Sequence, residues 1–218
     1  MEFITDVIQF FSMLDDRLLA MAQANAWTFV GVVALIIFVE TGVVVMPFLP
    51  GDSLLFVSGA VAAVTDVNVH VFALILIVAA VLGDAVNYTI GRRVGLKLFA
   101  NPDSKIFRQE YLAKTQAFYD KYGAFSIVMG RFVPIVRTFV PFLAGVARMP
   151  YSKFFFYNVT GGIFWVGSLM YAGYFLGNLP WAKENLSIIV IGIVIASVMP
   201  MVIKYWQEKR AATQASSH

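Results

Sequence analysis

Pro47-Phe48-Leu49-Pro50-Gly51-Asp52-Ser53 breaks an apolar region and decides how this chain folds. Before the break, residues 26–46 are apolar for long enough to cross a membrane, about 30 Å at 1.5 Å per residue. After it, residues 54–64 are apolar for only about half of that length. A long apolar arm, a Pro/Gly break at Pro47, Pro50 and Gly51, and a short apolar arm predict a re-entrant helical hairpin. Such backbone is tolerated at membrane depth only where protein covers it or water reaches it.

A second broken segment follows at residues 124–147. Its interruptions are Pro134, Pro141 and Gly145. The stretch Pro47-Phe48-Leu49-Pro50-Gly51 returns here as Pro141-Phe142-Leu143-Ala144-Gly145, which is a weak internal repeat. Two Pro/Gly-broken segments in corresponding halves of a membrane protein indicate a transporter binding site. We therefore expect inverted halves, each with a re-entrant hairpin.

The composition places the chain in the membrane. Of its 218 residues, 60% are hydrophobic and only 13% are charged, against about 25% charged residues in soluble domains. The mean hydropathy is +0.77. The N-terminus has no cationic segment typical of a secretory signal, and the absence of cysteine excludes disulfides and thiolate metal sites. The predicted fold class is an all-α polytopic membrane protein.

Three regions follow from the hydropathy pattern. Residues 1–25 have an apolar stripe at helical spacing and predict an amphipathic helix, lying at the membrane interface or packed against the bundle. Residues 26–205 form the transmembrane transport domain, and residues 206–218 a polar tail. Within the domain we expect ordinary spans at 71–91, 154–177 and 186–205, and a cationic surface helix at 104–122.

The basic residues predict the orientation. If both broken segments return to the side that they entered from, one face holds only Arg17 and Lys183, and the other holds twelve lysines and arginines. Cytoplasmic loops carry the excess of Lys and Arg, so we expect a cytoplasmic C-terminus. The side of the N-terminal helix depends on whether the first broken segment returns or crosses.

Five ionisable residues lie inside apolar segments. They are Glu40, Asp52, Asp84, Arg131 and Arg137. Each costs at least about 2.5 kcal/mol at the centre of a bilayer, so each must pair, face water or bind something. Internal pairing of an acid with an arginine, which would lock the hairpins together, is one explanation. Binding of an ionic cargo is the other.

The binding explanation assigns different roles to the two signs of charge. Arg131 and Arg137 lie on a Pro-broken segment, where a guanidinium fork and freed backbone N–H groups suit phosphate oxygens. Glu40 and Asp52 are carboxylates in an apolar setting, which can exchange protons near neutral pH. Asp52 could instead cap the helix that follows it.

A third acid has a more structural interpretation. Asp84, Asn87 and Tyr88 share a helix face, and we expect them to form hydrogen bonds across the bundle in support of the site.

The sequence does not contain the residues that several enzyme classes require. The only histidines are His70 and the terminal His218, so we expect no zinc site and no histidine base, and no Gly-x-Ser-x-Gly elbow occurs. An intramembrane aspartyl protease is disfavoured. Its signature is Gly-x-Gly-Asp, and neither Gly51-Asp52 nor Gly83-Asp84 has a glycine two residues before the Gly-Asp pair. We expect no enzyme, no cofactor, no metal and no nucleic acid, since no basic stripe stands apart from the apolar segments.

Three motifs stand out in the sequence. The first is Phe48-Leu49-Pro50-Gly51-Asp52 with Glu40 upstream, and the second is Tyr88-x-Ile90-Gly91-Arg92. The third is Gly130-Arg131-Phe132-x-Pro134-x-x-Arg137-x-x-x-Pro141-x-x-Ala144-Gly145. Together they resemble the DedA family, the bacterial branch of the SNARE-associated (VTT) superfamily. The resemblance covers about residues 30–180.

The resemblance implies two re-entrant hairpins meeting at mid-membrane in a bacterial inner-membrane protein. It also implies transport driven by the proton gradient, with undecaprenyl phosphate as a cargo that is recycled to the cytoplasmic face. By position, Glu40 and Asp52 match the essential acids of the family, and Arg131 and Arg137 match its essential arginines.

The leading hypothesis is a proton-linked flippase for undecaprenyl phosphate or a related phosphate-headed lipid. The alternatives are a proton-coupled ion or drug antiporter, a phospholipid scramblase, and a non-enzymatic scaffold in envelope stress. A homo-oligomer stays open. Finding both guanidinium groups sealed in ion pairs, with no opening beside them, would overturn the carrier hypothesis.

Overall fold

A computed structural model describes residue 22 and residues 24–43, 51–98 and 120–179. The predicted N-terminal amphipathic helix, the span at 186–205 and the polar tail lie outside these ranges, as do Pro47, Pro50 and most of the predicted surface helix at 104–122.

The described part is all helical. It contains no β-strand, which confirms the all-α class for these residues. The elements in chain order are α2 (Ala26–Gly42), α3 (Gly51–Val64), α4 (Val69–Leu98), the 3-10 helix η1 (Gly123–Phe125), α6 (Ser126–Gly130), α7 (Pro134–Val146) and α8 (Tyr151–Gly177).

Local signals account for the helix starts. Asn25 caps α2 by accepting a hydrogen bond from the backbone N–H of Thr28 at 3.1 Å. Asn68 does the same for α4, accepting from the N–H groups of His70 and Val71 at 3.0 and 3.2 Å. Pro134 begins α7, where its missing N–H costs nothing.

The second broken segment is interrupted at a different place from the one expected. Pro141 lies inside α7, and the helix continues to Val146, so the prediction that Pro141 breaks the helix is corrected. The interruption falls between α6 and α7, at residues 131–133, just before Pro134. Gly145 does not break the helix either: a Cβ there would lie 2.0 Å from the carbonyl oxygen of Tyr88, so this glycine lets α7 approach α4.

Among the described residues, two helices are long and apolar enough to cross a membrane. They are Val69–Arg93 within α4 and Tyr151–Gly177, and they match the spans predicted at 71–91 and 154–177. Along α4, large apolar side chains are exposed at helical spacing: Val71, Leu74, Val78, Leu82 and Val86. An exposed apolar stripe of this length is typical of contact with lipid.

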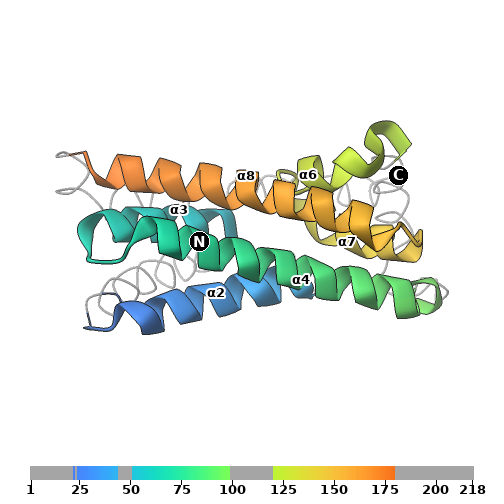
Figure 1. Ribbon diagram of the computed structural model, residues 1–218, viewed down its shortest axis with the longest axis horizontal. Coiled ribbons are helices and arrows are strands. Elements are labelled where there is room, and N and C mark those ends of the chain that lie inside the picture. Colours follow the sequence, from blue (N-terminus) through green and yellow to red (C-terminus); the bar gives the residue numbers. More distant parts are fainter. Residues whose placement is uncertain (1–21, 23, 44–50, 99–119, 180–218) are drawn as a thin grey trace, which may run out of the picture.

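Helices from the first half of the chain pack against helices from the second half. α4 and α8 run side by side along the molecule, with α3 near one end and α7 near the other (Figure 1). α3 packs mainly on α8, whereas α7 packs mainly on α4. Glycines make both crossings close: a Cβ on Gly59 or Gly173 would collide with the facing backbone of α8 or α3, and a Cβ on Gly91 or Gly145 with that of α7 or α4.

This reciprocal packing resembles what two related halves would produce. Whether the helix pairs are re-entrant and inverted depends on where the membrane surfaces lie, and both stay predictions.

Candidate functional site

The five ionisable residues of the apolar segments gather where the helices cross, and they divide into two groups. We call Arg131, Asp84 and Asn158 the Arg131 cluster, and Arg137, Glu40, Asp52 and Trp165 the Arg137 cluster. Each cluster joins residues from different helices that are far apart in the sequence.

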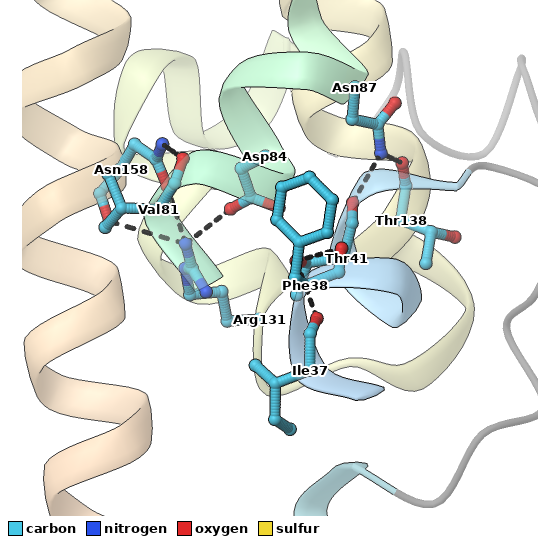
Figure 2. Close-up of polar contacts among 9 residues, drawn as sticks. All are labelled: Ile37, Phe38, Thr41, Val81, Asp84, Asn87, Arg131, Thr138 and Asn158. Carbon is cyan, nitrogen blue, oxygen red and sulfur yellow. Dashed lines mark hydrogen bonds and ion pairs between the residues drawn. The ribbon is translucent and has the colours of Figure 1, made fainter. Parts of the chain in front are cut away.

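The Arg131 cluster is closed. Nη2 of Arg131 donates to Asp84 and, at 2.6 Å, to Oδ1 of Asn158 on α8 (Figure 2). Asn158 is held in turn by donating to the carbonyl oxygen of Val81 at 3.0 Å. All three polar side chains are buried, and a Cβ on Gly161 would lie 3.1 Å from the Arg131 side chain. This arginine therefore lies flat against α8 with its charge neutralised by one acid.

The Arg137 cluster has the opposite character. Nη2 of Arg137 donates to Oε1 of Glu40, and Nη1 donates to Oδ1 of Asp52 at 2.8 Å. Glu40 is fully buried and the Arg137 side chain is 8% exposed, but the Asp52 side chain is 44% exposed. One guanidinium thus holds two carboxylates, one of them sealed inside and the other reachable from outside.

Backbone geometry brings the Arg137 cluster together. Asp52 lies in the first turn of α3, and Arg137 in the first turn of α7, which begins without a side-chain cap. A Cβ on Gly51 would collide with the carboxylate of Glu40, so this glycine lets the start of α3 meet the end of α2. Helix starts carry partial positive charge, which favours anions beside both first turns.

Trp165 connects the two clusters and was missed in the sequence. Its indole N–H donates to Oδ1 of Asp52 at 2.7 Å, and it is fully buried. Its ring centroid lies 4.8 Å from the guanidinium carbon of Arg137 and 5.7 Å from that of Arg131. A signal was present: tryptophan in membrane helices prefers the interfaces, and this one lies in the middle of α8.

The predicted supporting residues form hydrogen bonds across the bundle. Nδ2 of Asn87 donates to the carbonyl oxygens of Thr41 and Thr138, at 3.1 and 2.8 Å, and so joins the end of α2 to α7 (Figure 2). The hydroxyl of Tyr88 donates to the carbonyl oxygen of Met149. Asp84 pairs with Arg131, so these three residues hold helices together, as the sequence indicated.

Not every polar atom in this region is matched. Buried atoms without a hydrogen-bond partner among the described residues include Oε2 of Glu40, Nε of both arginines and Nη1 of Arg131. Buried polar groups normally have partners, often ordered water.

The carrier hypothesis would be overturned if both guanidinium groups were sealed in ion pairs. Only one of the two arginines is sealed in this way. Arg131 is sealed in an ion pair, whereas the partner Asp52 leaves the Arg137 cluster open on one side. A surface hollow lined by Asn25, Thr65 and Asp66 lies at the start of α2 and the end of α3, away from both clusters, and none of its described lining residues is basic. The Arg137 cluster is therefore the candidate functional site.

The charges in the Arg137 cluster do not balance. Two ionised acids and one arginine sum to −1 − 1 + 1 = −1, whereas Arg131 and Asp84 sum to zero. A cluster with net negative charge repels an anion unless at least one acid takes up a proton.

Comparison with known proteins gives one family. The VTT domain model matches residues 49–175. The chain is 49% identical to Protein DedA of Escherichia coli K12 over 99% of this chain and all of that protein. It is 41% identical to an uncharacterized membrane protein of Mycobacterium leprae, covering 83% of this chain and 81% of that one. It is 32% identical to the inner membrane protein YghB of E. coli K12, covering 68% of each. No solved structure matches.

Proposed function

Because this chain belongs to the DedA family of VTT-domain membrane proteins, we propose that it is a transporter driven by the proton-motive force. Its proposed cargo is undecaprenyl phosphate or a related phosphate-headed lipid, which it would flip across the bacterial inner membrane. The proposal needs no enzyme chemistry, cofactor or metal. The partners are the lipid, protons and the bilayer.

The observation that carries the proposal is the Arg137 cluster. A guanidinium that is 8% exposed lies between a fully buried acid and one whose side chain is 44% exposed. Arginine stays charged when buried and presents several donors to phosphate oxygens. The exposed acid gives Arg137 a partner that can exchange with an anion from outside, which Arg131 lacks among the described residues.

Charge balance supports the link to protons. With both acids ionised the cluster is negative; with both protonated it carries the single positive charge of Arg137, which suits an anionic headgroup. Protons entering from one side would thus prepare the site for phosphate, and their release would expel it. Glu40 and Asp52 are the proton carriers in this scheme, and Arg137 holds the phosphate.

The role of Arg131 differs in this proposal. Its pairing with Asp84 supports a positioning role, in which it fixes α6 against α8 beside Trp165. The sequence-based prediction that Arg131 also contacts phosphate stays a prediction, and the same assay tests it.

The experiment is headgroup translocation in liposomes containing the purified protein and a polyprenyl phosphate, with an imposed proton gradient. We expect Arg137→Gln to reduce the rate at least about 100-fold, because the headgroup loses its charge partner. Lys153→Gln, an exposed cation at the start of α8, is the matched control and should transport normally. Unchanged transport by Arg137→Gln would eliminate this site.

A second candidate is a proton-coupled cation or drug antiporter. The net charge of −1 in the ionised Arg137 cluster favours it, because a cation and a proton could compete for the same acids. Proton flux that depends on added cations and persists without phosphate lipid would support antiport. Headgroup movement in both directions that ignores the gradient would indicate a scramblase instead.

The absence of cysteine makes the proposed orientation easy to test. Single cysteines replacing Asn178 and Lys209 report on the two predicted faces. In intact cells an impermeant thiol reagent should label the first and not the second, if the C-terminus is cytoplasmic. Labelling of position 209 would reverse the orientation.

A further inference from the structure

We propose that Trp165 contacts the cargo, and that its indole N–H and Nη1 of Arg137 form one phosphate-oxygen site. The Asp52 carboxylate occupies this site whenever cargo is absent. The inference rests on the proposed function and adds to it a specificity residue and an internal competitor.

Two donors converge on one oxygen atom. Oδ1 of Asp52 accepts from Nη1 of Arg137 at 2.8 Å and from Nε1 of Trp165 at 2.7 Å. The donors come from α7 and α8, and the acceptor from α3. A charge-assisted guanidinium bond and an indole bond on one anionic oxygen are what a phosphate oxygen also requires.

Burial separates the fixed part of the site from the exchangeable part. Trp165 is fully buried and Arg137 nearly so, and the guanidinium lies 4.8 Å from the centre of the indole ring. This cation–π contact orients both donors together. Asp52 alone is substantially exposed. The donors therefore stay in place while the acceptor can leave toward the outside.

The exchange balances in charge. When Asp52 takes up a proton, its oxygen becomes a poor acceptor and releases both donors to a phosphate oxygen. When the phosphate leaves, Asp52 loses the proton and returns. At Asp52 one proton accompanies each exchange, separately from the proton that Glu40 carries, so these two donors never hold the Asp52 carboxylate and a phosphate at the same time.

The other charges around Asp52 fit this exchange. Glu40 from α2 binds the opposite nitrogen of the Arg137 guanidinium, and so keeps Nη1 aimed at the shared oxygen. Arg131 lies by the same indole ring, but its Nη2 is bound to Asp84 on α4 and its side chain is only 2% exposed. Asp52 is therefore the anion that a cargo would displace.

Trp165 also gives the site a preference. An indole has one N–H donor, no acceptor and no charge at any working pH. Its N–H can bind an anion oxygen but not a cation, and its ring face is already in contact with the guanidinium of Arg137. A cation antiporter would gain nothing from this donor, so the contact favours a phosphate cargo.

The test is binding of farnesyl phosphate to the full chain in detergent, measured by calorimetry, with farnesol as the matched ligand without phosphate. Trp165→Phe keeps an aromatic ring and removes the donor. We expect it to weaken farnesyl phosphate binding about tenfold, the value of one such hydrogen bond, and to leave farnesol unchanged. Trp27→Phe alters a tryptophan that is 71% exposed and is the control.

Asp52→Asn provides the second, independent variant. Removing the internal anion should tighten farnesyl phosphate binding at pH 8, and should weaken the gain in affinity that the wild type shows between pH 8 and pH 6. Equal or weaker binding by Asp52→Asn at pH 8 overturns the competition, even if Trp165→Phe does not fold.

The outcomes separate the two proposals. If the wild type binds farnesyl phosphate no better than farnesol, the proposed phosphate transport fails. If the wild type discriminates, and Arg137→Gln abolishes the discrimination, but Trp165→Phe binds as Trp27→Phe does, transport stands and the assignment of Trp165 is overturned.

Discussion

Arg131 and Arg137 lie six residues apart on one broken segment, yet they occupy opposite environments. Arg131 meets one acid and one amide, all buried, and its cluster is neutral. Arg137 meets two acids, one of them exposed, and its cluster is negative. The number and exposure of the partners, rather than the burial of the arginine, distinguish a structural clamp from a binding site.

The largest effect should come from opening the Arg131 cluster. Arg131→Met leaves Asp84 buried without its charge partner, and breaking a buried pair costs about 3–5 kcal/mol. We expect a loss of unfolding free energy of this size in denaturant titration of the detergent-solubilised protein. The control is Arg93→Met, which changes an exposed arginine near the C-terminal end of α4. Similar stabilities for both variants would mean that the clamp contributes nothing.

Replacing whole pairs should separate the clusters by function. Arg131→Met with Asp84→Leu removes a neutral pair and should fold and transport, because apolar replacement of a buried pair is often neutral. Arg137→Met with Glu40→Leu should also fold, but should lose at least about 100-fold in transport, or 2.7 kcal/mol at 1.36 kcal/mol per factor of ten. Equal transport by the two double variants would show that the Arg131 and Arg137 clusters do not differ in function.

The sequence predicted which residues form the candidate site, but it did not predict which of them pair with one another. The five misplaced charges and the Pro/Gly breaks stand out locally, because an apolar segment makes each exception visible. The pairing does not: Arg137 meets Glu40 and Asp52 across 97 and 85 residues, and helical periodicity informs only about neighbours within a turn or two. Nothing local distinguished Arg131 from Arg137.

The residues that were missed are the uncharged ones. Trp165 and Asn158 lie on α8, whose apolar segment carries neither a predicted break nor a charge. The position of Trp165 in the middle of this helix was the one available signal, and it is weaker than a charge in an apolar segment. Pro141 was predicted as a breaker from its type alone. The helix runs through it, because a neighbouring helix can satisfy the backbone groups that a proline frees; Asn87 on α4 donates to the carbonyl oxygen of Thr138, three residues before Pro141.

The two helix crossings offer a test of how the open cluster is held. A Cβ on Gly173 would lie 1.9 Å from the carbonyl oxygen of Phe56, whereas one on Gly167 meets nothing within 4 Å. Gly173→Ala should force α3 from α8, at a cost of about 1–3 kcal/mol, and should slow transport by separating Asp52 from Trp165. Gly167→Ala lies in the same helix and should be neutral or slightly stabilising, because alanine favours helix. Normal transport by a destabilised Gly173→Ala protein would show that this crossing does not hold the site.

The smallest effect concerns the uncharged partner of each arginine, and it tests the comparison most finely. Asn158 accepts from Arg131 and donates to Val81, so Asn158→Ala removes two buried hydrogen bonds. Hydrogen bonds between membrane helices contribute about 0.6 kcal/mol on average and at most about 1.7, so a loss of about 1–2 kcal/mol is expected. Because the Arg131 cluster is a clamp, this loss should appear in unfolding and not in binding of farnesyl phosphate. Trp165→Phe should show the reverse, since the indole N–H bonds the one carboxylate that cargo can displace. A change in ligand affinity in Asn158→Ala as large as that in Trp165→Phe would make the two clusters one site.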